Sequence, residues 1–231
     1  RTAYREERAR KAEEAVNKAG ELLSYSKPLD YGHEYITRKQ IHNMPWLRGK
    51  LRARMMQKSV LLDMVNAHGE LVGAQLIHED GSKKFLTGTA KQGAWHWLMK
   101  EPSMQWMSTM ECEVRIKRQQ DAIICVCEGW ATGCAVAEMN GLHRVVVAFD
   151  AGNLVHAVKR LLVLYPESPI VIFADDDEAN PKTAKCDGQA GADAARALDP
   201  VRISIEYPAW PNGVKPEKCS DFADLYLITH K

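Results

Sequence analysis

Two stretches of sequence, Cys125-Val-Cys-Glu-Gly-Trp-Ala-Thr132 and Val171-Ile-Phe-Ala-Asp-Asp-Asp177, decide the fold. In each, a short apolar run stops abruptly at carboxylates: Glu128 in the first, and Asp175, Asp176 and Asp177 in the second. A short apolar run between helical segments predicts a strand that is buried on both faces, as in a parallel sheet. Ligands bind at the carboxyl ends of such strands. We therefore expect Glu128, Asp175 and Asp177 to meet at one edge of a sheet.

The chemistry of these acids points to a metal ion. Carboxylates held close together are costly unless a cation lies among them. Oxygen ligands suit Mg²⁺, and Mn²⁺ accepts the same ligands. The hypothesis is a Mg²⁺ (or Mn²⁺) site for phosphoryl transfer on nucleic acid, with Glu128, Asp175 and Asp177 as catalytic and metal-binding residues. The alternative is that each carboxylate only caps the helix that follows its strand.

From residue 121 onward, strands and helices are expected to alternate. The pattern predicts strands at 123–127, 145–149, 170–174 and 201–205, with helices at 132–140, 154–164 and 188–198 between them. Such alternation is typical of an α/β fold with a mainly parallel sheet flanked by helices. Asp150 ends the second strand and is either a further metal ligand or a helix N-cap. The tail from Cys219 is expected to form a short helix capped by Ser220.

The first half of the chain predicts a smaller, basic α+β unit. A helix is expected at 4–25, a β-hairpin at 60–65 and 71–77, and a strand at 94–98, so that 59–98 forms a mainly antiparallel unit. Residues 100–118 are read as a helix or connector, which places the two domains at 1–118 and 119–231. His96, between two tryptophans, is expected to be a packed histidine.

Basic residues of this half are candidates for contact with an anionic ligand. Between 35 and 62 there is no acidic residue, and Arg54 stands in this block together with aromatic side chains. The block either tracks a phosphate backbone or is a solvated basic surface. Lys83, Lys84 and Lys91 are expected on or beside loops, where they can reach an anion. Lys182 and Lys185 follow the acidic loop and either contact phosphates or balance its charge.

Composition indicates the class of protein and the cell compartment to expect. The 231 residues carry a net charge of +1 and 45% apolar residues, as expected for one large or two small globular domains. No apolar run approaches the ~18 residues of a membrane span, and no signal peptide is recognisable. No Cys-x-x-Cys pair occurs among the six cysteines, so we expect buried reduced thiols and a cytoplasmic location. The chain begins with Arg1 rather than Met, which suggests a fragment.

Glu128-Gly129 and Asp175-Asp176-Asp177 resemble the two motifs of the Toprim domain, which bacterial-type primases, topoisomerases and some nucleases share. The resemblance covers roughly residues 120–205. It implies a Toprim-like sheet in which Glu128, Asp175 and Asp177 are the functional acids.

A second resemblance narrows the choice to primases. Arg54 to Trp97 looks like the basic subdomain that precedes Toprim in bacterial-type primases. The segment Ala148-Phe-Asp-Ala-Gly-Asn153 is most similar to primases of plasmids, phages and mobile elements. Such primases usually carry an Asp four residues after the Glu, where this chain has Thr132. Asp221 and Asp224 are the acids that could replace it.

The resemblance implies the catalytic core of a DNA primase, which synthesises short RNA primers on single-stranded DNA by metal-dependent nucleotidyl transfer. Ribonucleoside triphosphates would be the substrates, and a helicase or zinc-binding domain would lie elsewhere in a longer protein. The basic candidates would then guide template or triphosphate: Arg54, Lys83, Lys84, Lys91, Lys182 and Lys185. Two alternatives remain: a Toprim nuclease that uses the same acids with water, and a nucleic-acid-binding module without catalysis.

Overall fold

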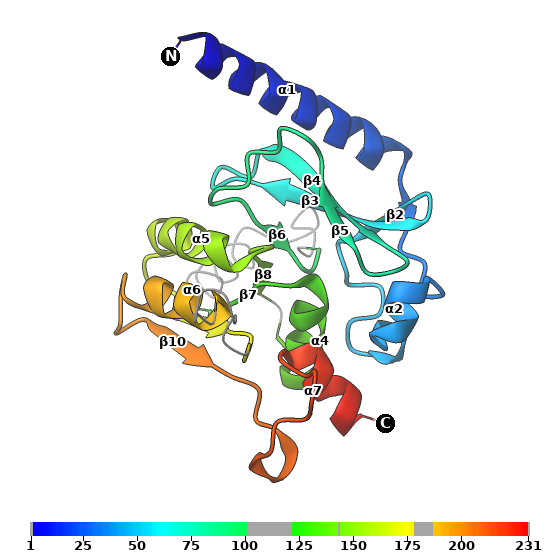
Figure 1. The fold of residues 1–231 in the computed structure, drawn as a ribbon, viewed down its shortest axis with the longest axis vertical. Helices are drawn as coiled ribbons and strands as arrows, with labels where there is room; N and C mark the ends of the chain where they lie inside the picture. Colours follow the sequence, from blue (N-terminus) through cyan, green and yellow to red (C-terminus); the bar gives the residue numbers. More distant parts are fainter. Residues whose placement is uncertain (1, 101–121, 143, 178–186, 231) are drawn as a thin grey trace, which may run out of the picture.

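The computed structural model describes residues 2–100, 122–142, 144–177 and 187–230, which form two five-stranded sheets and their helices (Figure 1). The helices are α1 (Thr2–Tyr25), α2 (Glu34–Arg38), α4 (Trp130–Asn140), α5 (Ala151–Leu164), α6 (Asp187–Arg196) and α7 (Phe222–Thr229), with 3-10 turns η1 (Ile41–Asn43) and η2 (Pro211–Gly213). The strands are β1 (Lys27–Pro28), β2 (Arg54–Met56), β3 (Ser59–Val65), β4 (Leu71–His78), β5 (Lys83–Phe85), β6 (His96–Trp97), β7 (Ile124–Cys127), β8 (Val145–Val147), β9 (Ile170–Phe173) and β10 (Ile203–Glu206).

The first sheet is antiparallel, with the strand order β1-β2-β3-β4-β5. The predicted hairpin is confirmed as β3 and β4, and the predicted first helix is confirmed as α1. α1 lies across the sheet, where its buried Ala19 packs with Leu61 and Ala74 (Figure 1). Small side chains at this contact let the helix approach β4 closely. One face of the sheet is thereby covered, and the other faces the rest of the molecule.

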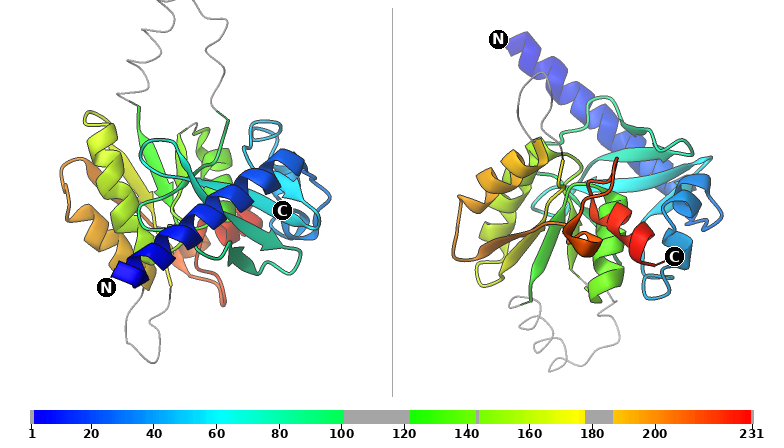
Figure 2. Two further views of the ribbon diagram at one scale, coloured as in Figure 1. Left: turned by 90° about the horizontal axis from the view of Figure 1, so that it is seen from above. Right: turned by 60° about the horizontal axis from the view of Figure 1, so that its bottom comes forward.

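The second sheet has the order β10-β9-β7-β8-β6, and its first four strands are parallel. This confirms the predicted alternation of strands and helices after residue 121. α5 and α6 pack on one face through residues such as Leu154 and Ala192, and α4 covers the other (Figure 2). Gly141, with φ +62°, ends α4 in the left-handed conformation.

The strand predicted at 94–98 forms as β6, but the prediction was wrong about its partner. His96 and Trp97 pair with Val147 and Val146 of β8, so β6 completes the second sheet instead of extending the hairpin. The isolated bridge between Val65 and Trp95 ties this segment to the first sheet. The physical reason is that β8 would otherwise present an unpaired edge. Sequence alternation predicts a strand but does not say which edge it joins.

A buried polar link connects the two sheets. Asp63 of β3 forms a 2.9 Å hydrogen bond with Nδ1 of His96, which is fully buried, as expected for a packed histidine. Asp63 also pairs with Arg52 at 2.5 Å. Burial on its own would raise the pKa of Asp63, but His96 and Arg52 more than offset burial and hold that pKa well below its ordinary value.

The tail helix α7 forms as predicted, but its cap is Asp221 and not Ser220. The Asp221 carboxylate accepts a 2.8 Å hydrogen bond from the backbone N–H of Asp224. Asp224 in turn accepts from the N–H of Ser220 at 3.1 Å. A carboxylate satisfies the free N–H groups and adds a favourable interaction with the helix dipole, which a hydroxyl lacks.

Some expectations from the sequence fall outside the described residues. These are the connector at 101–118, the proposed domain boundary at 118, and Cys112 and Cys186. The described thiols Cys125, Cys127 and Cys134 are buried and free, and Cys219 is free and half-buried. In the described part of the chain, no helix has both the length and the apolar character of a membrane span.

Candidate active site

The two acidic motifs lie at the carboxyl ends of neighbouring strands. β7 and β9 are parallel partners, with Cys127 opposite Phe173, so Glu128 and Asp175 leave the sheet at the same edge. Both residues line one cavity of about 330 Å³. Asp177 lies beside Asp175, because both contact Gly188 at the start of α6. A Cβ at Gly188 would stand 3.3 Å from Oδ2 of Asp177 and 3.4 Å from Cβ of Asp175. The structure therefore brings the three acids to one edge, as the sequence predicts.

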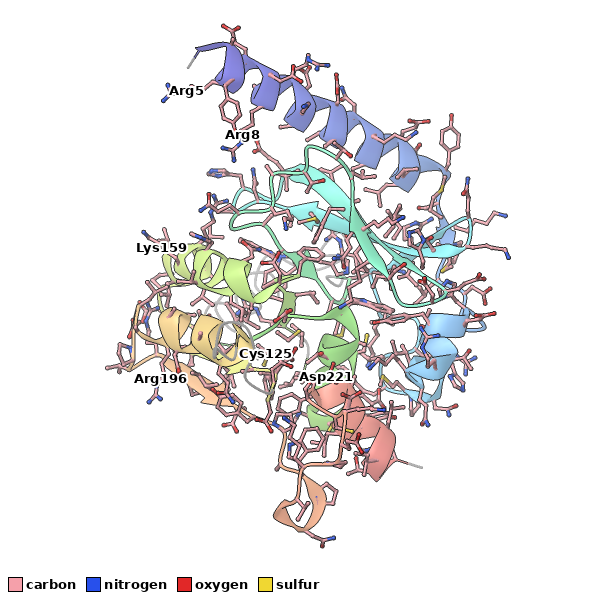
Figure 3. The ribbon with its side chains drawn as sticks, viewed as in Figure 1. Arg5, Arg8, Cys125, Lys159, Arg196 and Asp221 are labelled. Carbon is pink, nitrogen blue, oxygen red and sulfur yellow. The ribbon has the colours of Figure 1, made fainter. Side chains whose placement is uncertain are left out.

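The cavity has one acidic and one basic wall. Its acidic wall consists of Glu128, Asp175 and Asp221, the last from the start of α7 (Figure 3). Its basic wall comes from the first half of the chain and contains Arg38, Lys39 and Lys83, with Asp80 beside them. The cavity thus lies between the two sheets and takes residues from both.

Burial and mutual repulsion shift the acids toward their neutral forms. Burial raises the pKa of Glu128 to about 7, and Asp177, Asp150 and Asp221 add to the rise, while Lys83 opposes it. Burial also raises the pKa of Asp175 to about 8, with further increases from Glu128, Asp221 and Asp177. Such raised values indicate a site that a cation would stabilise.

The donors fit a hard divalent cation in chemistry, although their spacing is not that of a closed metal centre. Oδ1 of Asp175 is buried and has no hydrogen-bond partner, which is costly for a carboxylate oxygen. Among the described residues, no three His, Cys, Asp or Glu side chains lie close enough together to hold a metal ion. Mg²⁺ is usually bound through one or two carboxylates plus waters and substrate phosphates. An incomplete protein shell around Glu128 and Asp175 fits this mode of binding.

The structure distinguishes Lys83 from Lys84. Lys83 lines the cavity, and its Nζ lies beside the Glu-Gly motif, 3.6 Å from where a Cβ at Gly129 would stand. Lys84 pairs with Leu76, whose side chain packs on the α1 side of the first sheet. Because directly opposed residues share a face, Lys84 lies on the face away from the cavity.

The other predicted site residues that the structure describes, Asp150, Lys91 and Arg54, have structural partners. Asp150 caps α5 by accepting from the N–H of Asn153 at 2.9 Å, and it pairs with Lys91 at 3.2 Å. Its charge still contributes to the raised pKa of Glu128. Arg54 donates to the hydroxyl and carbonyl oxygens of Ser26, and it is not among the residues that line the cavity. Lys182 and Lys185 lie outside the described residues.

Asp221 is a hydrogen-bond partner of Thr132, the residue at which the sequence departs from the primase pattern. The Thr132 hydroxyl donates to Oδ2 of Asp221 at 3.2 Å. A carboxylate from the distant tail therefore lies beside the position where the resembling primases carry an Asp. Sequence reasoning raised Asp221 only as one of two replacements, because the tail's path across α4 cannot be derived from local patterns.

Sequence reasoning missed Arg38 and Lys39 as individual site residues. Both belong to the acid-free block, but nothing in the block sets them apart from its other basic residues. Arg38 lies over the Tyr35 ring at 5.7 Å and donates to the carbonyl of Glu79 at 3.0 Å, and Lys39 pairs with Asp224 at 3.2 Å.

Asp176, between the candidate acids Asp175 and Asp177, contacts the tail and does not line the cavity. Its carboxylate accepts from Nε1 of Trp210 at 3.0 Å, and Lys215 lies 3.6 Å away. Its backbone N–H donates to the carbonyl of Ser220 at 2.7 Å. The middle Asp of the motif thus holds the tail that carries Asp221.

Comparison with known proteins finds related sequences and a related fold. The chain is 28% identical over 217 residues to a DNA primase TraC of Escherichia coli, with 90% of this chain and 14% of that protein covered. A second Escherichia coli DNA primase TraC is 29% identical over 223 residues, with coverage of 93% and 19%. No protein-family model matches the chain.

The primase fragment of the bacteriophage T7 primase-helicase protein has a similar structure. Its TM-score is 0.52 at 16% identity, and the alignment covers 89% of this chain and 76% of that one. This likeness concerns the mixed α/β fold alone. The chain spans less than a fifth of the length of the two TraC proteins. Together, these comparisons confirm that the chain resembles bacterial-type DNA primases of plasmids and phages over nearly its whole length.

Proposed function

We propose that this chain is the catalytic core of a DNA primase, which joins ribonucleotides into short primers on a single-stranded DNA template. Similarity to DNA primase TraC over 90% of the chain supports this activity. The observation that carries it to specific residues is the shared cavity of Glu128 and Asp175, where Oδ1 of Asp175 is buried without a hydrogen-bond partner. Residues 119–231 are the Toprim-type catalytic domain, and residues 1–118 are the basic subdomain.

The residues have distinct roles in nucleotidyl transfer. Glu128 would either bind one divalent ion together with Asp175 or accept the proton of the attacking 3′ hydroxyl at its carboxylate, whose pKa is about 7 in the metal-free chain. Asp175 and Asp177 would hold Mg²⁺ or Mn²⁺, with Asp150 at the rim of the same edge. The divalent ion would reduce the charge cost of in-line displacement at the α-phosphate. Lys83 and Arg38, on the opposite wall, bind the triphosphate as cations.

The wider setting of the reaction is part of the proposal. Because the chain covers so little of the TraC proteins, a helicase or a zinc-binding template reader would belong to other parts of a longer protein or to partners. The remaining proposed contacts for template or triphosphate are Lys91, Lys182, Lys185, Lys84 and Arg54, and Lys91 pairs with Asp150. The proposed location is the cytoplasm, where replicating DNA is found.

Incorporation of labelled ribonucleotides on single-stranded DNA, with Mg²⁺ or Mn²⁺, tests this function. Synthesis by the parent chain should be lost in Glu128→Gln and in Asp175→Asn, which change charge but keep shape. Glu13→Gln, an exposed position on α1, is the matched control and should retain synthesis. Synthesis that survives both site substitutions would remove the proposed roles. Cleavage of an end-labelled template without synthesis would favour the nuclease, and binding with neither reaction would favour a non-catalytic module.

A further inference from the structure

A second hollow lies along α5, outside the candidate active site. Its outer part is a cavity of about 470 Å³ that includes His68, Gln92, His156, Lys159, Arg160 and Val163 in its lining. Its inner part, of about 240 Å³, shares Gln92 and His156 and ends at Lys91 and Asp150. The two parts adjoin at Gln92 and His156, and together they are here named the α5 groove.

The α5 groove is built for an anion. No carboxylate lines its outer part, which carries an ammonium group, a guanidinium group and two imidazoles. Gly93 makes room for the guanidinium, since a Cβ there would stand 2.4 Å from Nε of Arg160. Nη1 of Arg160 donates to the carbonyl of Gly93 at 3.3 Å, which holds the guanidinium group at the groove and leaves its other N–H groups for a ligand. Lys159 is exposed on α5 and projects from the molecule (Figure 3).

The α5 groove is also partly apolar, which argues against a small free anion as its ligand. Val163 is 78% exposed and Leu164 is 39% exposed at its outer end. Gln92 and His156 are in contact at 3.1 Å and offer hydrogen-bonding edges in the middle. Single-stranded nucleic acid is bound by this combination of groups along one path. Cations contact its phosphates, apolar surface packs against its sugars and bases, and polar groups offer hydrogen bonds.

The position of the α5 groove relative to the acids selects a polynucleotide over an acidic peptide. In the strand order β9-β7-β8, Asp175, Glu128 and Asp150 follow one another along the sheet edge. Asp150 is also the inner end of the groove. A nucleic-acid strand that passes the acids therefore enters the α5 groove directly. The first turns of α1, with Arg5 and Arg8, overhang the same side of the molecule (Figures 2 and 3).

We propose that the α5 groove binds the backbone and bases of the single strand that passes through the active-site cavity. The inference rests on the proposed primase function, because it identifies where the polynucleotide of that reaction runs. Lys159 and Arg160 contact phosphates, and Val163 lies against sugar and base faces. The groove extends the length of strand held by the chain beyond the nucleotides at the acids.

Direct binding tests this inference separately from catalysis. The 231-residue chain is titrated into a fluorescein-labelled oligo-dT 20-mer without divalent metal or nucleotide, and anisotropy is recorded from 25 to 200 mM NaCl. Lys159→Ala should weaken binding severalfold and flatten the slope of log Kobs against log[NaCl] by about 0.7, the value for one lost phosphate contact on a single strand. Lys27→Ala is the matched control, because Lys27 is an exposed lysine on β1 that does not line the α5 groove. It should change neither the affinity nor the salt slope.

A second variant guards against a Lys159 substitution that acts through folding. Val163→Asp places a carboxylate in the α5 groove and should weaken binding at least as much, with unchanged circular dichroism. If neither variant differs from Lys27→Ala, the groove does not bind the strand and the inference fails. If poly-glutamate competes with the oligonucleotide and its binding shows the same dependence on Lys159, the groove is a site for acidic protein, which also overturns it.

The failure of the proposed function would look different. A parent chain that makes no primers, yet binds oligo-dT with the expected dependence on Lys159 and Val163, loses the primase proposal and keeps the groove. A parent chain that makes primers, with template binding unaffected by both groove variants, keeps the primase proposal and loses the groove.

Discussion

Replacing Asp175 by Asn should make the metal-free protein more stable at alkaline pH, even though it abolishes the proposed activity. The carboxyl of Asp175 has a pKa of about 8 in the folded chain, against an ordinary value of 3.8. In the unfolded chain the group ionises above pH 4, while in the folded chain it holds its proton almost to pH 8. The parent therefore loses stability as the pH rises from about 4 to about 8, and Asn, which carries no charge, does not.

The size of the effect follows from the same values. Each unit of pKa difference corresponds to ~1.4 kcal/mol, so a difference of about four units sets an upper limit of roughly 5–6 kcal/mol above pH 8. Part of this penalty is relieved when Glu128 takes up a proton instead, because the two acids repel one another. We expect a net gain of about 3 kcal/mol for Asp175→Asn at pH 8 and little gain at pH 4.5.

Urea unfolding in EDTA, followed by far-ultraviolet circular dichroism at pH 4.5 and pH 8, measures this gain. Glu13→Gln on the exposed face of α1 serves as control and should show no pH-dependent difference from the parent. Mg²⁺ should raise the stability of the parent and leave Asp175→Asn unchanged. An Asn variant that is no more stable than the parent at pH 8 would refute the reasoning, because the buried carboxylate would then carry no electrostatic strain.

Three further predictions concern neighbouring residues. Asp63→Asn should lower the free energy of unfolding by about 3 kcal/mol, because Arg52 and buried His96 lose their anionic partner; a urea midpoint like the parent's would contradict this. Lys83→Ala should move the acid limb of the pH profile of kcat/KM to higher pH, since the Lys83 cation lowers the pKa of Glu128; an unmoved limb would place Lys83 outside the site. Gly129→Ala should raise the KM for nucleotide with little loss of folding stability, because the added methyl group would stand 3.2 Å from the Thr132 hydroxyl, which donates to Asp221 of the cavity; an unchanged KM would count against that contact.

The sequence predicts those parts of the fold that depend on local pattern and strand-end chemistry. The run Ile124–Cys127 is apolar on both faces, so it could be recognised as a central strand, and the acid after it had to stand at the sheet edge. Local pattern could not reveal that β6 pairs with β8, because pairing partners are decided by which edge remains open. It also could not choose between Lys83 and Lys84, which are adjacent and differ only in the face of β5 they occupy.

The tail residues show why the candidate site was only partly predictable. Asp221 reaches the cavity because Asp176 binds Trp210 and the backbone of the tail, and because α7 packs on α4. These are contacts between residues more than thirty positions apart in the sequence, and no periodicity reports them. The raised pKa of Asp175 likewise depends on burial and on three neighbouring acids, Glu128, Asp177 and Asp221, two of which lie far from it in the sequence.

The most direct test of the central claim is a crystal of the chain soaked with Mn²⁺ and a ribonucleoside triphosphate, examined by anomalous scattering. We predict an anomalous peak in contact with the carboxylates of Glu128 and Asp175, with the triphosphate reaching toward Lys83. A nucleotide and Mn²⁺ bound elsewhere, with these two carboxylates free of metal, would contradict it.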